Sequence, residues 1–355
     1  MSERERRAES VMCRFSTSTP RTILVRAPNW LGDQILAYPF FYHLRHGYPE
    51  AQITVACVPW VASLQFRHLV DAVCLLPQSQ TIWAKAWALE AHSAMLRAQG
   101  PWDLGLCLPH SFGSAWLLAR ARVRWRRGYR TEARGWLLHE SLDWQPWRLQ
   151  HRAEAYVQVL PDAVRPSHVR QAYSAPFDAA AAWPIDPPLL PPSEPYWILA
   201  PGSMATSRRW PLEHFAALAQ RIAANTALTG LVVGWNAEAS MAQHLCANST
   251  LRLRDYTARG AVSQYASLFQ QAHFTVSNDS GLAHVAALCG SPVYIVWGAG
   301  DPTITAPLGP GPVHVLHHQV DCWPCVRNVC QQPPARQRAC LRGLDPETVW
   351  KALRL

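Results

Sequence analysis

The sequence contains no apolar run that approaches the roughly 18 residues needed for a membrane-spanning helix, and charged residues make up only 16% of its 355 residues. Because hydrophobic residues make up 49% of the chain, this shortage of charge excludes a disordered protein and predicts a folded, soluble one. The N-terminus also lacks the apolar segment of a secretory signal. We therefore expect residues 1–20 to form a disordered tail and the protein to be cytoplasmic.

Acidic residues are fewer than basic ones, 24 against 33, which gives a net charge of +9 and a pI near 9.2. This balance suits an anionic partner such as nucleic acid, anionic lipid headgroups or phosphorylated sugars. Much of the excess lies in an arginine-rich stretch, residues 120–134, where Trp125 and Tyr129 are interleaved with the arginines. The chain has no zinc-finger spacing, helix-turn-helix pair or RNA-recognition signature, so we expect no nucleic-acid partner.

Ten cysteines in a small secreted domain would indicate disulfides, but this chain is long and carries no export signal. Six of them are scattered singly, while Cys322, Cys325, Cys330 and Cys340 lie close together in the sequence. Four thiolates could hold a tetrahedral zinc ion or form redox pairs, although their spacing matches no standard zinc module. Reduced, packed thiols remain the alternative, and the sequence does not decide between them.

The chain alternates short apolar strands with helical segments, and no solenoid or propeller repeat is present. We expect strands at 22–26, 52–57, 72–76, 102–108, 196–200, 230–233 and 293–297, and helices near 35–44, 212–224 and 238–247. Seven prolines between residues 174 and 195 indicate a linker. The predicted organisation is therefore two doubly wound α/β domains, 21–173 and 196–355, joined by a 174–195 linker, with ligands at the carboxyl ends of the strands.

Residues 273–290 are the most informative stretch, because an apolar strand runs directly into Ser277-Asn278-Asp279-Ser280-Gly281 and then into an apolar helix. The free amides and the positive end of such a helix form a cradle for a diphosphate. A carboxylate at Asp279 would repel phosphate unless it faces sugar hydroxyls, which indicates a nucleotide sugar. The alternative is that Asp279 or Ser280 simply caps the helix. His284, one turn beyond Ser280, either points to the same site or is a buried, satisfied histidine.

A second glycine loop follows the strand at 196–200. Ser203 offers a hydroxyl there, and Arg208 and Arg209 can neutralise a departing diphosphate, although a pair of arginines can also be simply solvated. Glu238, after the next strand, could accept hydrogen bonds from both ribose hydroxyls or could be an ordinary first-turn glutamate. We interpret these side chains as the other wall of the nucleotide-sugar site.

Asp33 lies in the turn after the first strand, within Asn29-Trp30-Leu31-Gly32-Asp33. The glycine allows the backbone to approach a ligand, and a carboxylate at this strand end can accept a proton from an incoming hydroxyl. The competing interpretation is an ordinary helix cap. The position favours catalysis, because this turn would face the loop that carries Asp279.

The motifs together resemble those of the ADP-heptose:lipopolysaccharide heptosyltransferases, and within them the heptosyltransferase II branch. The resemblance runs in order from about residue 22 to the end. The matching segments are Asn29-Trp30-Leu31-Gly32-Asp33, Leu108-Pro109-His110-Ser111-Phe112, Pro201-Gly202-Ser203, Arg208-Arg209-Trp210-Pro211 and Ser277-Asn278-Asp279-Ser280-Gly281-Leu282-Ala283-His284.

This resemblance implies the GT-B fold, in which two Rossmann-like domains face each other across a cleft, with the acceptor on the first and the nucleotide sugar on the second. The family's catalytic aspartate falls on Asp33 and its sugar-binding aspartate on Asp279. Its phosphate-binding basic residue, commonly lysine, falls on Arg208. The planar guanidinium of arginine can bind the diphosphate with a different geometry from that of a lysine ammonium group.

Neighbouring phosphate and helix-cap positions of the family fall on Ser280, Gly281 and His284, while Glu238 matches a ribose-binding acidic residue only loosely. The implied activity is inverting transfer of heptose from ADP-heptose to the inner-core heptose of lipopolysaccharide, with no cofactor or metal required. We expect a monomer that acts peripherally at the cytoplasmic face of the inner membrane.

The acceptor, lipid A carrying Kdo and heptose, is phosphorylated and acidic. We expect it to contact Asn29 and the arginine-rich stretch, through Arg120, Arg124, Arg127 and Arg130. One alternative keeps the fold and chemistry but changes the nucleotide sugar or the core acceptor. Another, of a different class, is a noncatalytic protein that binds a sugar nucleotide or nucleic acid; the Gly-Asp pair of the first loop argues against it, since a pure binder has no use for a placed carboxylate.

Overall fold

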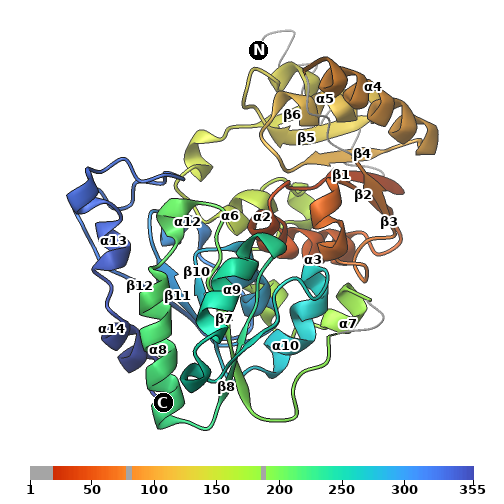
Figure 1. Cartoon of the computed structure of the whole chain (residues 1–355). Helices are drawn as coiled ribbons and strands as arrows, with labels where there is room; N and C mark the ends of the chain where they lie inside the picture. Colours follow the sequence, from red (N-terminus) through yellow and green to blue (C-terminus); the bar gives the residue numbers. More distant parts are fainter. Residues whose placement is uncertain (1–18, 77–81, 185–188) are drawn as a thin grey trace.

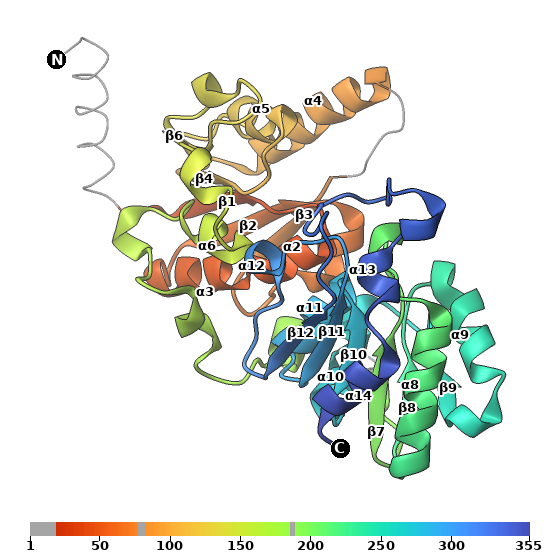
Figure 2. The same ribbon diagram turned by 90° about the vertical axis from the view of Figure 1, so that its left-hand side faces the viewer.

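The computed structural model describes residues 19–76, 82–184 and 189–355, which form two six-stranded parallel sheets with helices packed against them (Figure 1). In both views the first sheet and its helices lie above the second (Figure 2). Most of the expected N-terminal tail, and part of the expected linker, lie outside the described residues. No helix in the described ranges is long and apolar enough to cross a membrane.

The first sheet has the strand order β3-β2-β1-β4-β5-β6 with parallel pairing throughout. The central strand, Ile-Leu-Val flanked by Thr22 and Arg26, is almost wholly buried, as is usual for a parallel sheet covered on both faces. The strands are β1 (Thr22–Arg26), β2 (Gln52–Cys57), β3 (Ala72–Leu75), β4 (Leu104–Cys107), β5 (Trp125–Tyr129) and β6 (Glu140–Leu142). The helices are α2 (Leu31–Leu36), α3 (Tyr38–Gly47), α4 (Ile82–Gln99), α5 (Phe112–Arg120) and α6 (Arg152–Val157).

The second sheet repeats this order as β12-β11-β10-β7-β8-β9, again with parallel pairing. Its strands are β7 (Tyr196–Ala200), β8 (Thr229–Val232), β9 (Leu253–Asp255), β10 (Thr275–Asn278), β11 (Val293–Trp297) and β12 (Val313–His317). Its helices include α8 (Leu212–Asn225), α9 (Ala239–Cys246), α10 (Ala266–Gln271), α11 (Gly281–Leu288), α12 (Pro302–Thr305), α13 (Ala339–Arg342) and α14 (Pro346–Leu353). Two doubly wound sheets confirm the expected fold class.

The strand order reverses between β1 and β4 and again between β7 and β10. In open α/β sheets, ligands bind at the carboxyl ends of the strands that flank such a switch point. The loops that carry Asp33, His110, Ser203 and Asp279 each follow one of these four strands. The four loops that carry the sequence motifs therefore lie at the switch points of the two sheets.

The structure differs from the expected elements in two places. The helix expected at 35–44 is two helices, α2 and α3, which meet at Ala37, and Pro39 lies in the first turn of α3. Part of the proline-rich segment packs on the first sheet's helices, since Phe177 and Trp183 are buried and their rings lie 4.9 Å apart. Phe177 also contacts the Tyr38 ring at 5.3 Å, which fixes this stretch to α3.

Candidate active site

The loops after β7 and β10 are tied together by buried side chains. Asn278 donates through its amide nitrogen to the Pro201 carbonyl at 2.6 Å, and its Oδ1 accepts from the Trp210 backbone N–H at 3.0 Å. The Ser203 hydroxyl donates to the Asp279 carbonyl at 3.1 Å. These bonds hold the two loops as one wall, so the side chains that they carry are positioned before any ligand binds.

An ion pair lies at the centre of this wall, with Arg208 Nη1 3.2 Å from Asp279 Oδ2. The Asp279 side chain is only 4% exposed, and its burial raises the pKa of that carboxyl to about 6 although the Arg208 charge opposes the rise. Burial of a carboxylate with a single cation is costly. The arrangement is explained if a ligand supplies the missing hydrogen bonds.

Apart from this ion pair, Asp279 Oδ2 has no hydrogen bond. Three more buried polar atoms also lack a hydrogen-bond partner, namely Arg208 Nε, His284 Nδ1 and Trp297 Nε1. Space is kept beside them by Gly300, because a Cβ at that position would lie 2.5 Å from Asp279 Oδ2 and 3.0 Å from Trp297 Nε1. Native proteins satisfy nearly all buried polar groups. Unsatisfied donors and acceptors that converge on one place therefore indicate a site for a polar ligand.

The start of α11 is not capped by a side chain. Ser280 occupies the N-cap position without a capping bond, and its hydroxyl instead pairs with Ser277 Oγ at 3.3 Å. The amides of the first turn are therefore not used by the Ser280 side chain. This arrangement suits an anion at the helix start better than the capping alternative does.

Glu238 and Arg209 lie at the edge of the same wall and are partly engaged by the protein. Glu238 Oε2 accepts from the Trp235 backbone N–H at 2.6 Å, and burial raises the pKa of its carboxyl. Its other oxygen faces Gly202, where a Cβ would lie 1.9 Å from Oε1. Arg209 Nε donates to the Ser203 carbonyl at 2.7 Å. Arg209 thus stabilises the loop. Glu238 makes a structural hydrogen bond, while its binding of a ribose stays a prediction.

Asp33 approaches this wall from the first sheet. It lies inside α2, whose N-cap position belongs to Trp30, so Asp33 is not the helix cap. Burial raises the pKa of its carboxyl, while the charges of Arg152 and Arg208 and a hydrogen bond from the Tyr156 hydroxyl oppose the rise. A carboxylate in this setting, once ionised, can act as a general base, and the nearby cations favour its ionised form.

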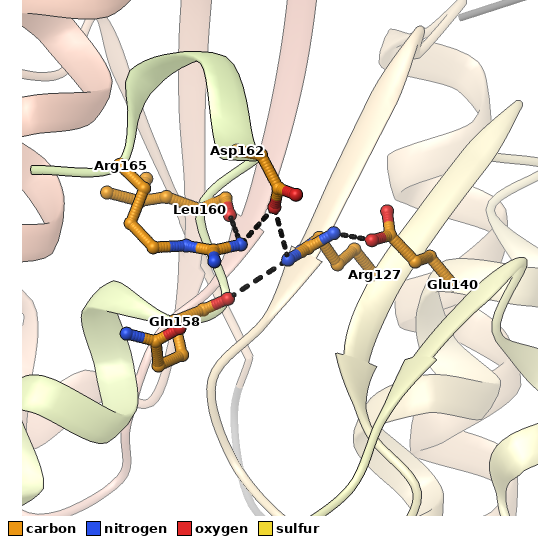
Figure 3. Close-up of polar contacts among 6 residues, drawn as sticks. All are labelled: Arg127, Glu140, Gln158, Leu160, Asp162 and Arg165. Atoms are coloured by element: carbon orange, nitrogen blue, oxygen red, sulfur yellow. Dashed lines mark hydrogen bonds and ion pairs between the residues drawn. The ribbon is translucent and has the colours of Figure 1, made fainter. Parts of the chain in front are cut away.

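The arginine-rich stretch, residues 120–134, is only partly exposed. We expected Arg127 to bind the acceptor, and the structure corrects this expectation. Arg127 lies on β5 and its side chain is only 3% exposed. Its guanidinium forms ion pairs with Glu140 and Asp162 and donates to the Gln158 carbonyl, and Asp162 also pairs with Arg165 (Figure 3). Burial lowers the pKa of Arg127 to about 10. The residue is therefore structural.

The remaining acceptor candidates lie at the surface or within the first loop. Arg120 pairs with Glu90 at 2.7 Å and Arg130 with Asp143 at 3.4 Å. Arg124 is exposed. Asn29 Oδ1 accepts from Arg26 Nη2 at 2.5 Å, and its backbone carbonyl accepts from the Trp60 indole at 2.7 Å. Their roles toward an acceptor stay predictions.

A family model described as glycosyltransferase family 9 (heptosyltransferase) matches residues 90–336. The chain belongs to this family. It is 26% identical over 304 residues to lipopolysaccharide heptosyltransferase 2 of Escherichia coli K12, covering 81% of this chain and 85% of that protein. Among solved structures, E. coli ADP-heptose LPS heptosyltransferase II has a TM-score of 0.72 at 23% identity, covering 94% and 97% of the two chains. E. coli heptosyltransferase WaaC with ADP has a TM-score of 0.68 at 18% identity, covering 94% and 99%.

Family membership makes the protein a glycosyltransferase and confirms the resemblance inferred from its motifs. The structure adds residues that the sequence argument missed. Arg152 and Tyr156 lie one turn apart on α6, and both act on Asp33. Their spacing of four residues was the only available signal, since it places both side chains on one helix face.

The four late cysteines gather around a cavity of about 340 Å³. All four are free thiols, and Cys330 Sγ accepts a hydrogen bond from the Arg338 backbone N–H at 3.3 Å. Within the described ranges, no group of three or more His, Cys, Asp or Glu side chains is placed to hold a metal ion. The segment that carries these cysteines is bonded to the loop after β7, because Ser207 N donates to the Asn328 carbonyl at 3.2 Å.

Proposed function

We propose that this family 9 glycosyltransferase transfers heptose from ADP-heptose to an inner-core heptose of lipopolysaccharide with inversion at the anomeric carbon. The observation that carries the proposal is the packing of the Asp33 turn against the second half of the chain, where a Cβ at Gly32 would lie 3.0 Å from His284 Cδ2 and the Arg208 charge acts on Asp33. A base on one side and a phosphate-binding cation on the other are the two groups that a displacement at a sugar diphosphate requires. The similarity of the chain to the lipopolysaccharide heptosyltransferases named above supports this assignment.

In the proposed single displacement, the acceptor hydroxyl gives its proton to the Asp33 carboxylate while its oxygen attacks the anomeric carbon and the bond to ADP breaks. Arg208 and the first amides of α11 stabilise the negative charge that grows on the diphosphate. Asp279 accepts hydrogen bonds from the heptose hydroxyls and Glu238 from the ribose. The chain supplies every charge in this scheme, so we propose no metal or cofactor.

We further propose that the protein acts as a monomer at the surface of an anionic membrane. Phe112 and Trp116 on α5 and Trp136 in the 3-10 turn Gly135–Leu137 form an aromatic cluster with ring centroids 6.0–6.5 Å apart, in which Phe112 and Trp136 are exposed. The Arg120 guanidinium lies 5.8 Å from the Trp116 ring. Tryptophan beside arginine is typical of the membrane interface. Flotation with vesicles containing anionic lipid should recover the wild-type protein, and Trp136→Ala should reduce the bound fraction.

The decisive test of the activity incubates the purified protein with a heptose-containing core acceptor and ADP-heptose, UDP-sugars or GDP-sugars in parallel. We expect mass spectrometry to detect one added heptose with ADP-heptose alone. Asp33→Asn should abolish transfer and leave ADP-heptose affinity nearly unchanged. Transfer from another nucleotide sugar would replace the donor assignment, and turnover by Asp33→Asn would remove the proposed base.

A further inference from the structure

Arg152 lies outside all of the sequence motifs described above. It begins α6, and its guanidinium carbon lies 5.2 Å from the centroid of the Trp144 ring. Trp144 packs in turn against His110 at 4.2 Å and Tyr129 at 5.0 Å. The three rings come from the loop after β4, the end of β5 and the segment before α6, so His110 and Tyr129 hold the Trp144 ring on which the guanidinium lies.

The Arg152 charge acts on Asp33, but among the described residues no carboxylate lies within ion-pair distance of it, and its buried Nε has no hydrogen-bond partner. The neighbouring Arg120, Arg127 and Arg130 each have such a partner. Burial together with the charges of Arg152 and Arg134 lowers the pKa of His110 to about 4, so this ring stays neutral near pH 7. Among the described residues, Arg152 therefore has a charge without an ion-pair partner and a buried donor without an acceptor, as a binding residue for an anion from outside the chain would.

The same helix reaches the proposed base. Tyr156, one turn after Arg152, forms a side-chain hydrogen bond with Asp33. His151, which precedes Arg152, contacts the carbonyl of Ala306, in the second half of the chain, through Nε2 at 2.9 Å. Because α6 is held at both ends of this short stretch, an anion bound at Arg152 would lie at a fixed place relative to the Asp33 carboxylate.

We propose that Arg152, backed by the Trp144 ring, is an anion-binding subsite that takes a carboxylate or phosphate of the acceptor and so positions the acceptor hydroxyl at Asp33. The inference rests on the proposed function and names a part of its acceptor site. A guanidinium backed by an aromatic face binds both groups through paired N–H donors, and its charge is partly desolvated before the acceptor arrives. Arg152 is thus a binding and positioning residue.

The experiment measures binding directly, by calorimetric titration of a deacylated acceptor oligosaccharide into wild type, Arg152→Gln and Arg152→Lys. Loss of a charged hydrogen bond costs about 1.5–3 kcal/mol, so we expect the oligosaccharide Kd of Arg152→Gln to rise about tenfold or more, with partial rescue by Lys. The ADP-heptose Kd should change less than twofold. Arg221→Gln on α8, at a residue that already pairs with Glu347, is the matched control and should bind like wild type.

Two modified oligosaccharides identify the anion. One lacks its phosphates, and the other has its sugar-acid carboxylates reduced to alcohols. The oligosaccharide that has lost the recognised group should bind wild type and Arg152→Gln equally, while the other should keep the difference. An unchanged Kd in Arg152→Gln, no binding to wild type, or the same penalty with both modified oligosaccharides would each overturn the subsite. Binding that depends on Arg152 without heptose transfer would instead overturn the proposed activity and leave the subsite standing.

Discussion

Gly32 lies directly against the imidazole of His284, which comes from the other half of the chain. A Cβ at residue 32 would be 3.0 Å from His284 Cδ2 and 3.1 Å from Nε2. The reciprocal contact is tighter, since a Cβ at Gly281 would be 2.6 Å from Leu31 Cδ2. The two sheets therefore meet through a pair of glycines beside Asp33, and burial lowers the pKa of His284 to about 3, which keeps this contact uncharged.

Adding one methyl group at this contact should misalign the two halves. We expect Gly281→Ala to lower kcat between about tenfold and a hundredfold, because displacements near 1 Å in an active site have effects of this size. ADP-heptose affinity should fall less, since the loops proposed to bind ADP-heptose, after β7 and β10, both come from the second sheet. Steady-state kinetics would check this expectation.

The matched control is Gly113→Ala on α5, where the new Cβ would meet only Leu89 Cδ2 at 3.8 Å. This is an ordinary contact, and alanine favours the helix. Gly113→Ala should therefore keep its activity. Equal kcat values in the two variants would show that the glycine contact does not align the site.

The hydrogen bond from Tyr156 to Asp33 should set the acidic limb of the pH profile. Its removal in Tyr156→Phe withdraws a donor that stabilises the carboxylate form, so the already raised pKa of Asp33 should rise further. A base works only above its pKa, and the fall in kcat/KM on acidification should therefore begin at a higher pH than in wild type. Tyr173→Phe, which removes a buried hydroxyl without a partner, should leave the limb in place.

Arg208 should act on the donor and on its neighbour Asp279. A charged hydrogen bond contributes about 1.5–3 kcal/mol, so Arg208→Met should raise the ADP-heptose Kd about ten- to a hundredfold. Arg208→Lys should retain more affinity, because it keeps the charge that relatives of this family place there. Loss of the ion pair should also raise the pKa of Asp279. Arg221→Met on α8, which pairs with Glu347, is the surface control, and a Kd equal to that of Arg208→Met would count against a specific role.

The strands that could be predicted from the sequence are those with continuous apolar, β-branched runs. The runs at 22–26, 52–57, 196–200 and 293–297 coincide with β1, β2, β7 and β11, because a strand buried on both faces leaves little room for polar residues. The loops at the ends of β1, β7 and β10 were recognisable for the same local reason. Their glycines, hydroxyls and carboxylates follow the buried strands directly.

What could not be predicted depends on contacts between distant residues. The arginine-rich stretch was expected to contact the acceptor. It contains β5 instead, because Arg127 can be buried once Glu140 and Asp162 lie beside it. Arg134 is likewise buried, and its Nη1 donates to the Pro109 carbonyl at 2.6 Å. For Arg152 the only local signal is its four-residue spacing from Tyr156, because the aromatic rings next to it come from separate segments.

The burial of Asp279 should make the ligand-free protein less stable as the pH rises. Its pKa is raised from 3.8 to about 6, so the folded state holds this proton more tightly than the unfolded chain does. The cost of ionising Asp279 is absent below pH 4, grows through the interval from 4 to 6, and is complete above it. At 1.36 kcal/mol per pKa unit, the full cost is about 3 kcal/mol.

Asp279→Asn cannot ionise and should therefore be more stable than wild type above pH 6, by up to about 3 kcal/mol, with the difference shrinking toward pH 4. Urea denaturation from pH 4 to 8 would measure this difference. Asp321→Asn, at a side chain that is 91% exposed, should follow the wild-type curve. Parallel curves for wild type and Asp279→Asn would contradict a destabilising carboxylate. Because the same carboxylate is proposed to bind the heptose hydroxyls, the stabilised variant should also bind ADP-heptose more weakly, which is the usual exchange of stability for function at a ligand site.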